Sequence, residues 1–180
     1  GRLEPGVCYR LWSEHLRLQP HSTAEILQAD LAALLLELAG WGVRDTAQLR
    51  WLDIPPAAHI AQATQLLQRL GALDAAAQIT AHGRAMLELA THPRLAHMML
   101  RGAELGHGAL ACELAALLGE RDPLSHALAG DADIVSRLEW LRGRGAWTDV
   151  ARGLRRQLRD AVQQWQRQLR CVRSPADHGD

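Results

Sequence analysis

The sequence predicts a mainly α-helical protein, with strands confined to a short N-terminal segment and one small hairpin. Two observations predict this class. Apolar residues recur at spacings of three and four through most of the chain after residue 22, which is the period of an amphipathic helix. Hydrophobic residues make up 48% of the 180 residues, enough for a packed core, yet no apolar run approaches the ~18 residues of a membrane span. We therefore expect one or two domains and no membrane partner.

The first element expected is a strand over residues 5–13. Val7, Tyr9 and Leu11 alternate with their neighbours in the period-two pattern of a half-buried strand. A Pro-Gly turn signal precedes them.

The first helix is expected to begin near Ala24, with Ser22 or Thr23 as its N-cap, and to end at Gly40. A second helix is expected over about residues 57–71. The apolar residues of the first helix have helical spacing: Ile26, Leu27, Leu31, Leu34, Leu35 and Leu38.

Residues 72–80 consist of two short apolar pieces around a small polar linker, which favours a β-hairpin. Thr80 is then placed to N-cap a third helix. The order helix, helix, small hairpin, helix is that of a winged-helix unit. Such a unit is a helix-turn-helix relative that can bind nucleic acid or only pack against a neighbour.

From Pro93 onward the pattern is helical, and short Gly-containing links suit a helical bundle. The clearest segment is about 147–172, where one apolar stripe faces an arginine-rich side. The stripe is Leu154, Leu158, Val162, Trp165, Leu169 and Val172. The tryptophans are expected to be core anchors rather than base-stacking platforms: Trp12, Trp41, Trp51, Trp140, Trp147 and Trp165.

The net charge is zero, but the segment from Arg137 to Arg173 contains ten Arg and only three acidic residues. This excess of positive charge indicates a phosphate-facing surface. All twenty basic residues are Arg, so this chain supplies no phosphate-loop or Schiff-base lysine. The three Cys are far apart and the histidines lack ligand spacing, so we expect no disulfide framework and no metal site. With no export signal, we expect a cytoplasmic location.

Several stretches of the chain together resemble one known family. GRLEPGVCYRLWSE resembles the end of the second RecA-like domain of DEAH-box helicases, and AEILQADLAALLLELAGWG resembles that family's first winged-helix helix. WLDIPP, LLQRLGALD and ITAHGRAMLELATHPRLAHMML match the stretch that leads into the family's ratchet domain. ALLGERDPL, at 116–124, is similar to the bacterial HrpB-type subgroup. The resemblance covers residues 1–125 in order and is looser beyond them.

The resemblance implies four parts. These are the end of a RecA-like domain (1–21), a winged-helix domain (22–92), a ratchet-like helical bundle (93–173) and a tail (174–180). It also implies that Arg2 corresponds to an arginine finger in an incomplete catalytic site. ATP and Mg²⁺ would act in the parent helicase, upstream of this chain, and the chain itself would hold no cofactor.

The residues expected to contact nucleic acid are Arg152, Arg155, Arg156 and Arg159. The resemblance implies single-stranded RNA as the partner, although DNA is equally compatible with the residues, and the upstream RecA-like motor domains as neighbours. The function expected is an accessory, strand-guiding region of an ATP-dependent RNA helicase, without ATPase motifs of its own. The alternatives are a stand-alone winged-helix nucleic-acid-binding module and a protein-docking helical scaffold. The arginine side of 152–173 is also what any solvated amphipathic helix presents.

Overall fold

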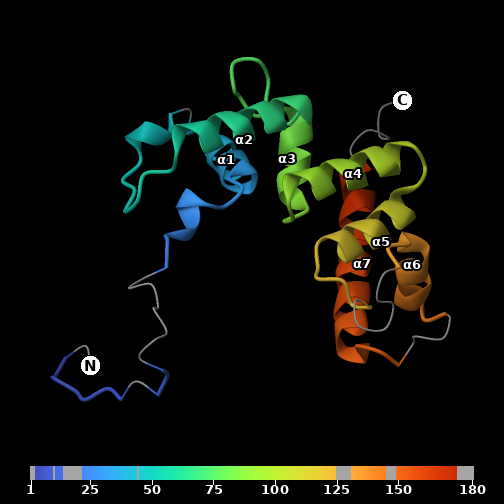
Figure 1. Cartoon of the computed structure of the whole chain (residues 1–180). Helices are drawn as coiled ribbons and strands as arrows, with labels where there is room; N and C mark the ends of the chain where they lie inside the picture. The colour runs from blue at the N-terminus through green and yellow to red at the C-terminus, as the bar shows by residue number, and fades with distance from the viewer. Residues whose placement is uncertain are drawn as a thin grey trace.

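The computed structural model describes residues 3–9, 11–13, 22–43, 45–124, 131–144 and 149–173, with side chains up to residue 170 (Figure 1). Its described elements are η1 (Glu25–Leu27), α1 (Ala32–Gly40), η2 (Thr46–Gln48), α2 (Ala57–Arg69), α3 (Ala81–Glu88), α4 (Pro93–Glu104), α5 (Gly108–Leu118), α6 (Ile134–Arg142) and α7 (Arg152–Arg173). The mainly helical class is confirmed. Among these helices, none combines the length and apolar character that crossing a bilayer requires.

The strand expected over residues 5–13 is not formed in the part of it that the structure describes. Val7, Tyr9 and Leu11 are 84%, 81% and 93% exposed, so the half-buried interpretation was wrong. Figure 1 shows this segment running away from the helices. A period-two pattern makes a strand only where another strand pairs with its backbone groups.

The helix expected from Ala24 is interrupted before α1. The short turn η1 is preceded by Ala24 at its cap position, rather than by a Ser or Thr, and the chain then bends. Asp30 restarts the helix, because its Oδ1 accepts the N–H of Ala32 at 2.8 Å. His92 Nε2 lies 3.3 Å from Asp30 Oδ2, so the start of α1 is tied to the start of α4.

The expected hairpin is reduced to one antiparallel bridge, between Leu73 and Ile79. The Asp74 carboxylate accepts the N–H groups of Ala76 at 2.9 Å and Gln78 at 2.8 Å, so the chain reverses directly after the bridge. Thr80 caps α3 as expected, with Oγ1 accepting the N–H of Gly83 at 3.0 Å.

Helices α4 and α5 approach closely because small residues face one another. A Cβ on Gly102 would lie 2.6 Å from Ala111 Cβ, and one on Gly108 would lie 3.2 Å from Ala103 Cβ. Helix α5 then packs on α6 and α7, and α4 packs on α3. One hydrophobic core therefore runs from Leu31 to Leu169 through all seven α-helices that the structure describes.

The tryptophans divide between core and surface. Trp140 is buried, and its Nε1 donates to the Val150 carbonyl at 3.0 Å. Trp51 and Trp165 are partly buried and also donate to backbone carbonyls. Trp41 was expected in the core but is 77% exposed, because it follows α1 beyond the packed face. Trp147 lies outside the described residues.

Helix α7 returns to the first half of the chain. Trp165 Nε1 donates to the Leu89 carbonyl at 2.9 Å, and Gln168 Nε2 donates to the Glu88 carbonyl at 3.0 Å. These carbonyls belong to the end of α3, where helical backbone acceptors have no partner of their own. Side chains of α7 thus complete the end of a helix almost eighty residues earlier.

An ion pair between a buried arginine and an exposed aspartate holds the segment before α6 against that helix. Arg137 donates from Nε to Asp122 Oδ1 at 3.3 Å and from Nη2 to Asp122 Oδ2 at 2.8 Å. Its Nη1 donates to the Asp133 carbonyl at 3.2 Å and lies 3.6 Å from Asp131. The Arg137 guanidinium holds the pKa of Asp122 below its ordinary value.

We predict opposite effects of Ala at two glycines. A Cβ on Gly83 would lie 2.3 Å from the Ala72 carbonyl oxygen, whereas Gly153 has no neighbour within 4 Å. Gly83→Ala should lower the free energy of unfolding by about 1–3 kcal/mol through overpacking. Gly153→Ala should raise it by up to about 1 kcal/mol through helix propensity. Urea denaturation followed by circular dichroism measures both, and equal effects would contradict the close approach at Gly83.

We also predict a pH dependence at the Asp122–Arg137 pair. Because the folded-state pKa of Asp122 is lowered, its stabilisation is present above the unfolded pKa and is lost as pH falls through the folded pKa. Asp122→Asn should therefore lose less unfolding free energy than the wild type between about pH 6 and about pH 3. Parallel pH profiles from urea denaturation would show that the pair does not stabilise the fold.

Candidate nucleic-acid interface

Helix α7 carries the apolar stripe and the arginine side that the sequence predicts. Leu158, Val162 and Leu169 are buried, and Leu154 and Trp165 are partly buried. Most of the arginines lie on the exposed side of the helix: Arg152, Arg156, Arg159, Arg167 and Arg170. The stripe packs on α5 and α6, so its burial determines which side of the helix faces solvent.

The four arginines expected to contact nucleic acid have different surroundings. Arg152 is ion-paired with Asp149, its Nε lying 3.1 Å from Oδ1. Arg155 is half-buried beside the stripe, and its Nη1 is buried without a hydrogen-bond partner. Arg156 and Arg159 are exposed, and among the described residues neither has a carboxylate within ion-pair distance. Of the four, the structure therefore leaves two exposed arginines without an ion pair, beside one neutralised arginine and one half-buried arginine.

Arg159 shares a cavity with two arginines to which no pattern in the sequence points. With Arg142 and Arg144 it lines a cavity of about 360 Å³ between the end of α6 and α7. We call this the α6–α7 cleft. Arg142 and Arg144 belong to the same basic stretch of sequence, but no helical periodicity connects them to α7, so only the tertiary fold brings the three together.

Arg142 is held in place by acidic neighbours. Its Nη2 lies 2.6 Å from Glu113 Oε2, and its Nη1 lies 3.6 Å from Glu139 Oε1. The Glu113 carboxylate raises the pKa of the Arg142 guanidinium. Arg144 Nη1 lies 4.0 Å from the same Glu139 oxygen.

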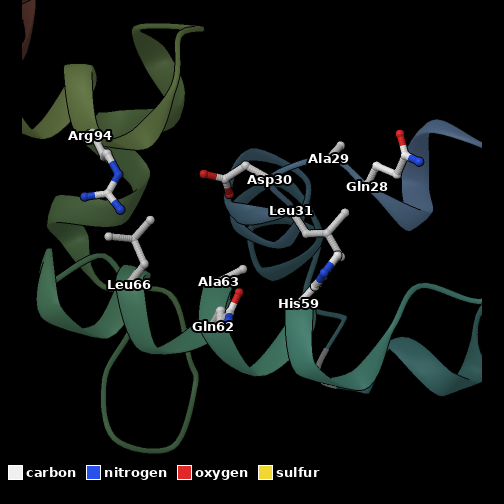
Figure 2. Close-up of a pocket in the computed structure, with 9 residues that line it drawn as sticks. All are labelled: Gln28, Ala29, Asp30, Leu31, His59, Gln62, Ala63, Leu66 and Arg94. Atoms are coloured by element: carbon white, nitrogen blue, oxygen red, sulfur yellow. The ribbon is translucent and has the colours of Figure 1, made fainter.

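A second cavity, of about 330 Å³, lies between the start of α1, helix α2 and the start of α4 (Figure 2). Figure 2 shows the Asp30 carboxylate extending toward the α4 side, from which Arg94 projects, while His59 and Gln62 extend from α2. His59 Nδ1 is buried without a hydrogen-bond partner. The N–H of Ala32 lowers the pKa of Asp30, and the charges of His92 and Arg94 lower it further.

This second cavity is lined by side chains of opposite charge, Asp30 and Arg94. Arg94 acts on Asp30 through its charge, without forming an ion pair within 4 Å. A carboxylate beside the guanidinium cancels the attraction for phosphate. The cavity therefore suits a neutral polar group better than a nucleic-acid backbone.

Other candidate groups add no catalytic site to the described residues. Arg2 lies outside them. His82 Nε2 lies 2.9 Å from His97 Nδ1, a contact that joins α3 to α4, and burial lowers the pKa of His82. No group of three or more metal-ligating side chains gathers within the part of the chain that the structure describes.

Known proteins similar to this chain are helicases. No protein-family model matches it. The chain is 39% identical to the ATP-dependent RNA helicase HrpB of Escherichia coli over 142 residues, which are 78% of this chain and 17% of the relative. It is 32% identical to the ATP-dependent RNA helicase HrpA of E. coli over 130 residues, 68% of this chain and 10% of that protein.

A crystal structure of the E. coli DEAH/RHA helicase HrpB matches the fold with a TM-score of 0.65 at 34% identity. That match covers 83% of this chain and 17% of the other. The chain thus spans about a sixth of the HrpB length. Sequence and fold agree on the same relative, and the chain therefore belongs to the HrpB-type DEAH-box helicases, of which it corresponds to a part.

Proposed function

We propose that this chain is an accessory region of an ATP-dependent RNA helicase that guides the single strand and couples it to the motor domains. Two relatives carry the name ATP-dependent RNA helicase, and the chain covers only a small part of each. Its winged-helix unit would be α1, α2, the Leu73–Ile79 bridge and α3, and its ratchet-like bundle would be α4 to α7. We place this activity in the cytoplasm.

The observation that supports strand guiding is the exposed arginine side of α7. The helix has 22 residues, seven of them Arg and one acidic. Among the described residues, Arg156, Arg159, Arg167 and Arg170 are exposed and have no ion-pair partner within 4 Å. Grooves that follow a nucleic-acid backbone depend on such uncompensated positive charge.

ATP and Mg²⁺ would be bound by other parts of the parent protein. Hydrolysis requires a phosphate-binding lysine, and this chain contains no lysine at all. Arg2 at the arginine-finger position would supply charge only where the motor domains hold the nucleotide. The work of this chain is then mechanical: to hold the strand while the motor domains move.

Protein docking is the second candidate, and an apolar surface favours it. Trp41, Leu52 and Ile54 are 77%, 100% and 78% exposed. Ile54 also lines a cavity of about 530 Å³ with Leu49, Trp51, Pro55 and Ile60. Exposed apolar area of this kind is typical of interaction surfaces. These residues lie between α1 and α2 in the chain or at the start of α2.

A stand-alone winged-helix regulator has less support. Its recognition helix would be α2, and Arg69 is the only basic residue of that helix besides His59. Major-groove readout normally uses several polar or basic side chains on one face.

We predict that single-stranded RNA binds α7. Fluorescence anisotropy should show micromolar binding that weakens steeply with salt. Changing Arg152, Arg155, Arg156 and Arg159 to Gln should weaken this binding at least about tenfold. The slope of log Kd against log salt should fall by about 0.7 for each RNA phosphate that the variant no longer neutralises.

The matched control changes four arginines away from α7 to Gln: Arg50, Arg69, Arg84 and Arg121. All four are exposed, so the control removes the same charge without removing the α7 side. If both variants weaken RNA binding equally, net charge alone accounts for the binding, and strand guiding by α7 is contradicted. No binding by the wild type at low salt would favour protein docking instead.

A further inference from the structure

The α6–α7 cleft gathers three guanidinium groups from separate places in the chain. Arg142 ends α6, Arg144 follows Gly143, and Arg159 projects from α7. Leu141 and Val162 provide an apolar floor, and both are buried. The groups therefore line a cavity of about 360 Å³ whose base is fixed by the core.

The charges in the cleft leave a positive surplus. Glu113 pairs with Arg142, and Glu139 lies near both Arg142 and Arg144. Three guanidinium groups against two carboxylates leave one positive charge, and among the described residues Arg159 has no acidic partner. Because its neighbours are already positioned by Glu113 and Glu139, an anion entering the cleft would order Arg159 and reorganise little else.

Two carbonyls at the end of α6 already accept hydrogen bonds from the backbone that follows the helix. Gly143 adopts a left-handed conformation with φ of 78°, and its N–H donates to the Trp140 carbonyl at 3.0 Å. The N–H of Arg144 donates to the Glu139 carbonyl at 2.7 Å. These bonds satisfy two of the carbonyls that the end of a helix leaves without a partner, which reduces the negative potential there. They also set the direction in which Arg144 leaves the helix.

We propose that the α6–α7 cleft is a phosphate subsite, which holds one phosphodiester group through Arg159 and Arg144, with Arg142 and the Gln163 amide at its wall. The single positive surplus matches the single charge of a phosphodiester, and planar guanidinium groups suit bidentate contact with its oxygens. This subsite rests on the proposed function, since it would fix one point of the strand that passes along α7. Free phosphate has the same chemistry, so it is the second anion that the cleft would bind.

The test compares single Gln variants in the 180-residue chain. Arg159 and Arg156 are both exposed arginines of α7, but only Arg159 lines the cleft. With labelled single-stranded RNA in fluorescence anisotropy, Arg159→Gln and Arg144→Gln should each weaken binding about tenfold. Arg156→Gln removes one charge of the strand-guiding side without touching the cleft, so it should also weaken binding, but by only about twofold to threefold. Circular dichroism melting shows whether each variant folds like the wild type.

A second arm uses inorganic phosphate, with the arginine Nε–H signals followed by NMR. In the wild type, phosphate should shift the Arg159 signal, and Arg144→Gln should reduce that shift. Equal RNA weakening by Arg159→Gln and Arg156→Gln, with no phosphate shift, would overturn the subsite and leave strand guiding intact. A phosphate shift at Arg159 without RNA binding would support the subsite, with a small phosphate as its source, and contradict the proposed function. If phosphate shifts no arginine signal and RNA does not bind, both the subsite and the proposed function are wrong.

Discussion

The contact between α7 and the end of α3 is the constraint on which the rest of the arrangement depends. Trp165 and Gln168 donate to the Leu89 and Glu88 carbonyls, so the rotation of α7 about its axis is fixed at this end by hydrogen bonds as well as by packing. Rotating α7 would break these bonds and leave the Leu89 carbonyl unpaired in a partly buried place. Because that rotation is fixed, Arg156 faces solvent and Arg159 faces the α6–α7 cleft.

The sequence predicted what local periodicity determines. The apolar stripe of α7, the Thr80 cap and the extent of α2 follow from residues close together in the chain, and the structure confirms each of them. The prediction of a strand at residues 5–13 also used local sequence alone, and it was wrong for that reason. Alternation describes which side chains could share a face, but a strand exists only through its partner, and local sequence carries no information on that partner.

The features that were missed depend on contacts between distant residues. Asp30 interrupts the first helix because it caps α1 and also reaches His92, sixty-two residues later. Asp122, inside the stretch that resembles HrpB, holds Arg137 across fifteen residues. The α6–α7 cleft similarly requires Gly143 to end α6 so that Arg144 can turn toward α7. No propensity or spacing rule predicts such pairs, since each depends on where the core has already placed two backbones.

The position of α7 at the end of the described chain has a consequence for synthesis. Helices α3 and α5 leave the ribosome before α7, yet α5 packs on α7 and the end of α3 needs its side chains. Until Trp165 and Gln168 have emerged, those acceptors and the apolar face of α5 stay open to water and to other chains. The apolar face of α5 and the end of α3 are therefore among the last parts of this core to be covered during synthesis.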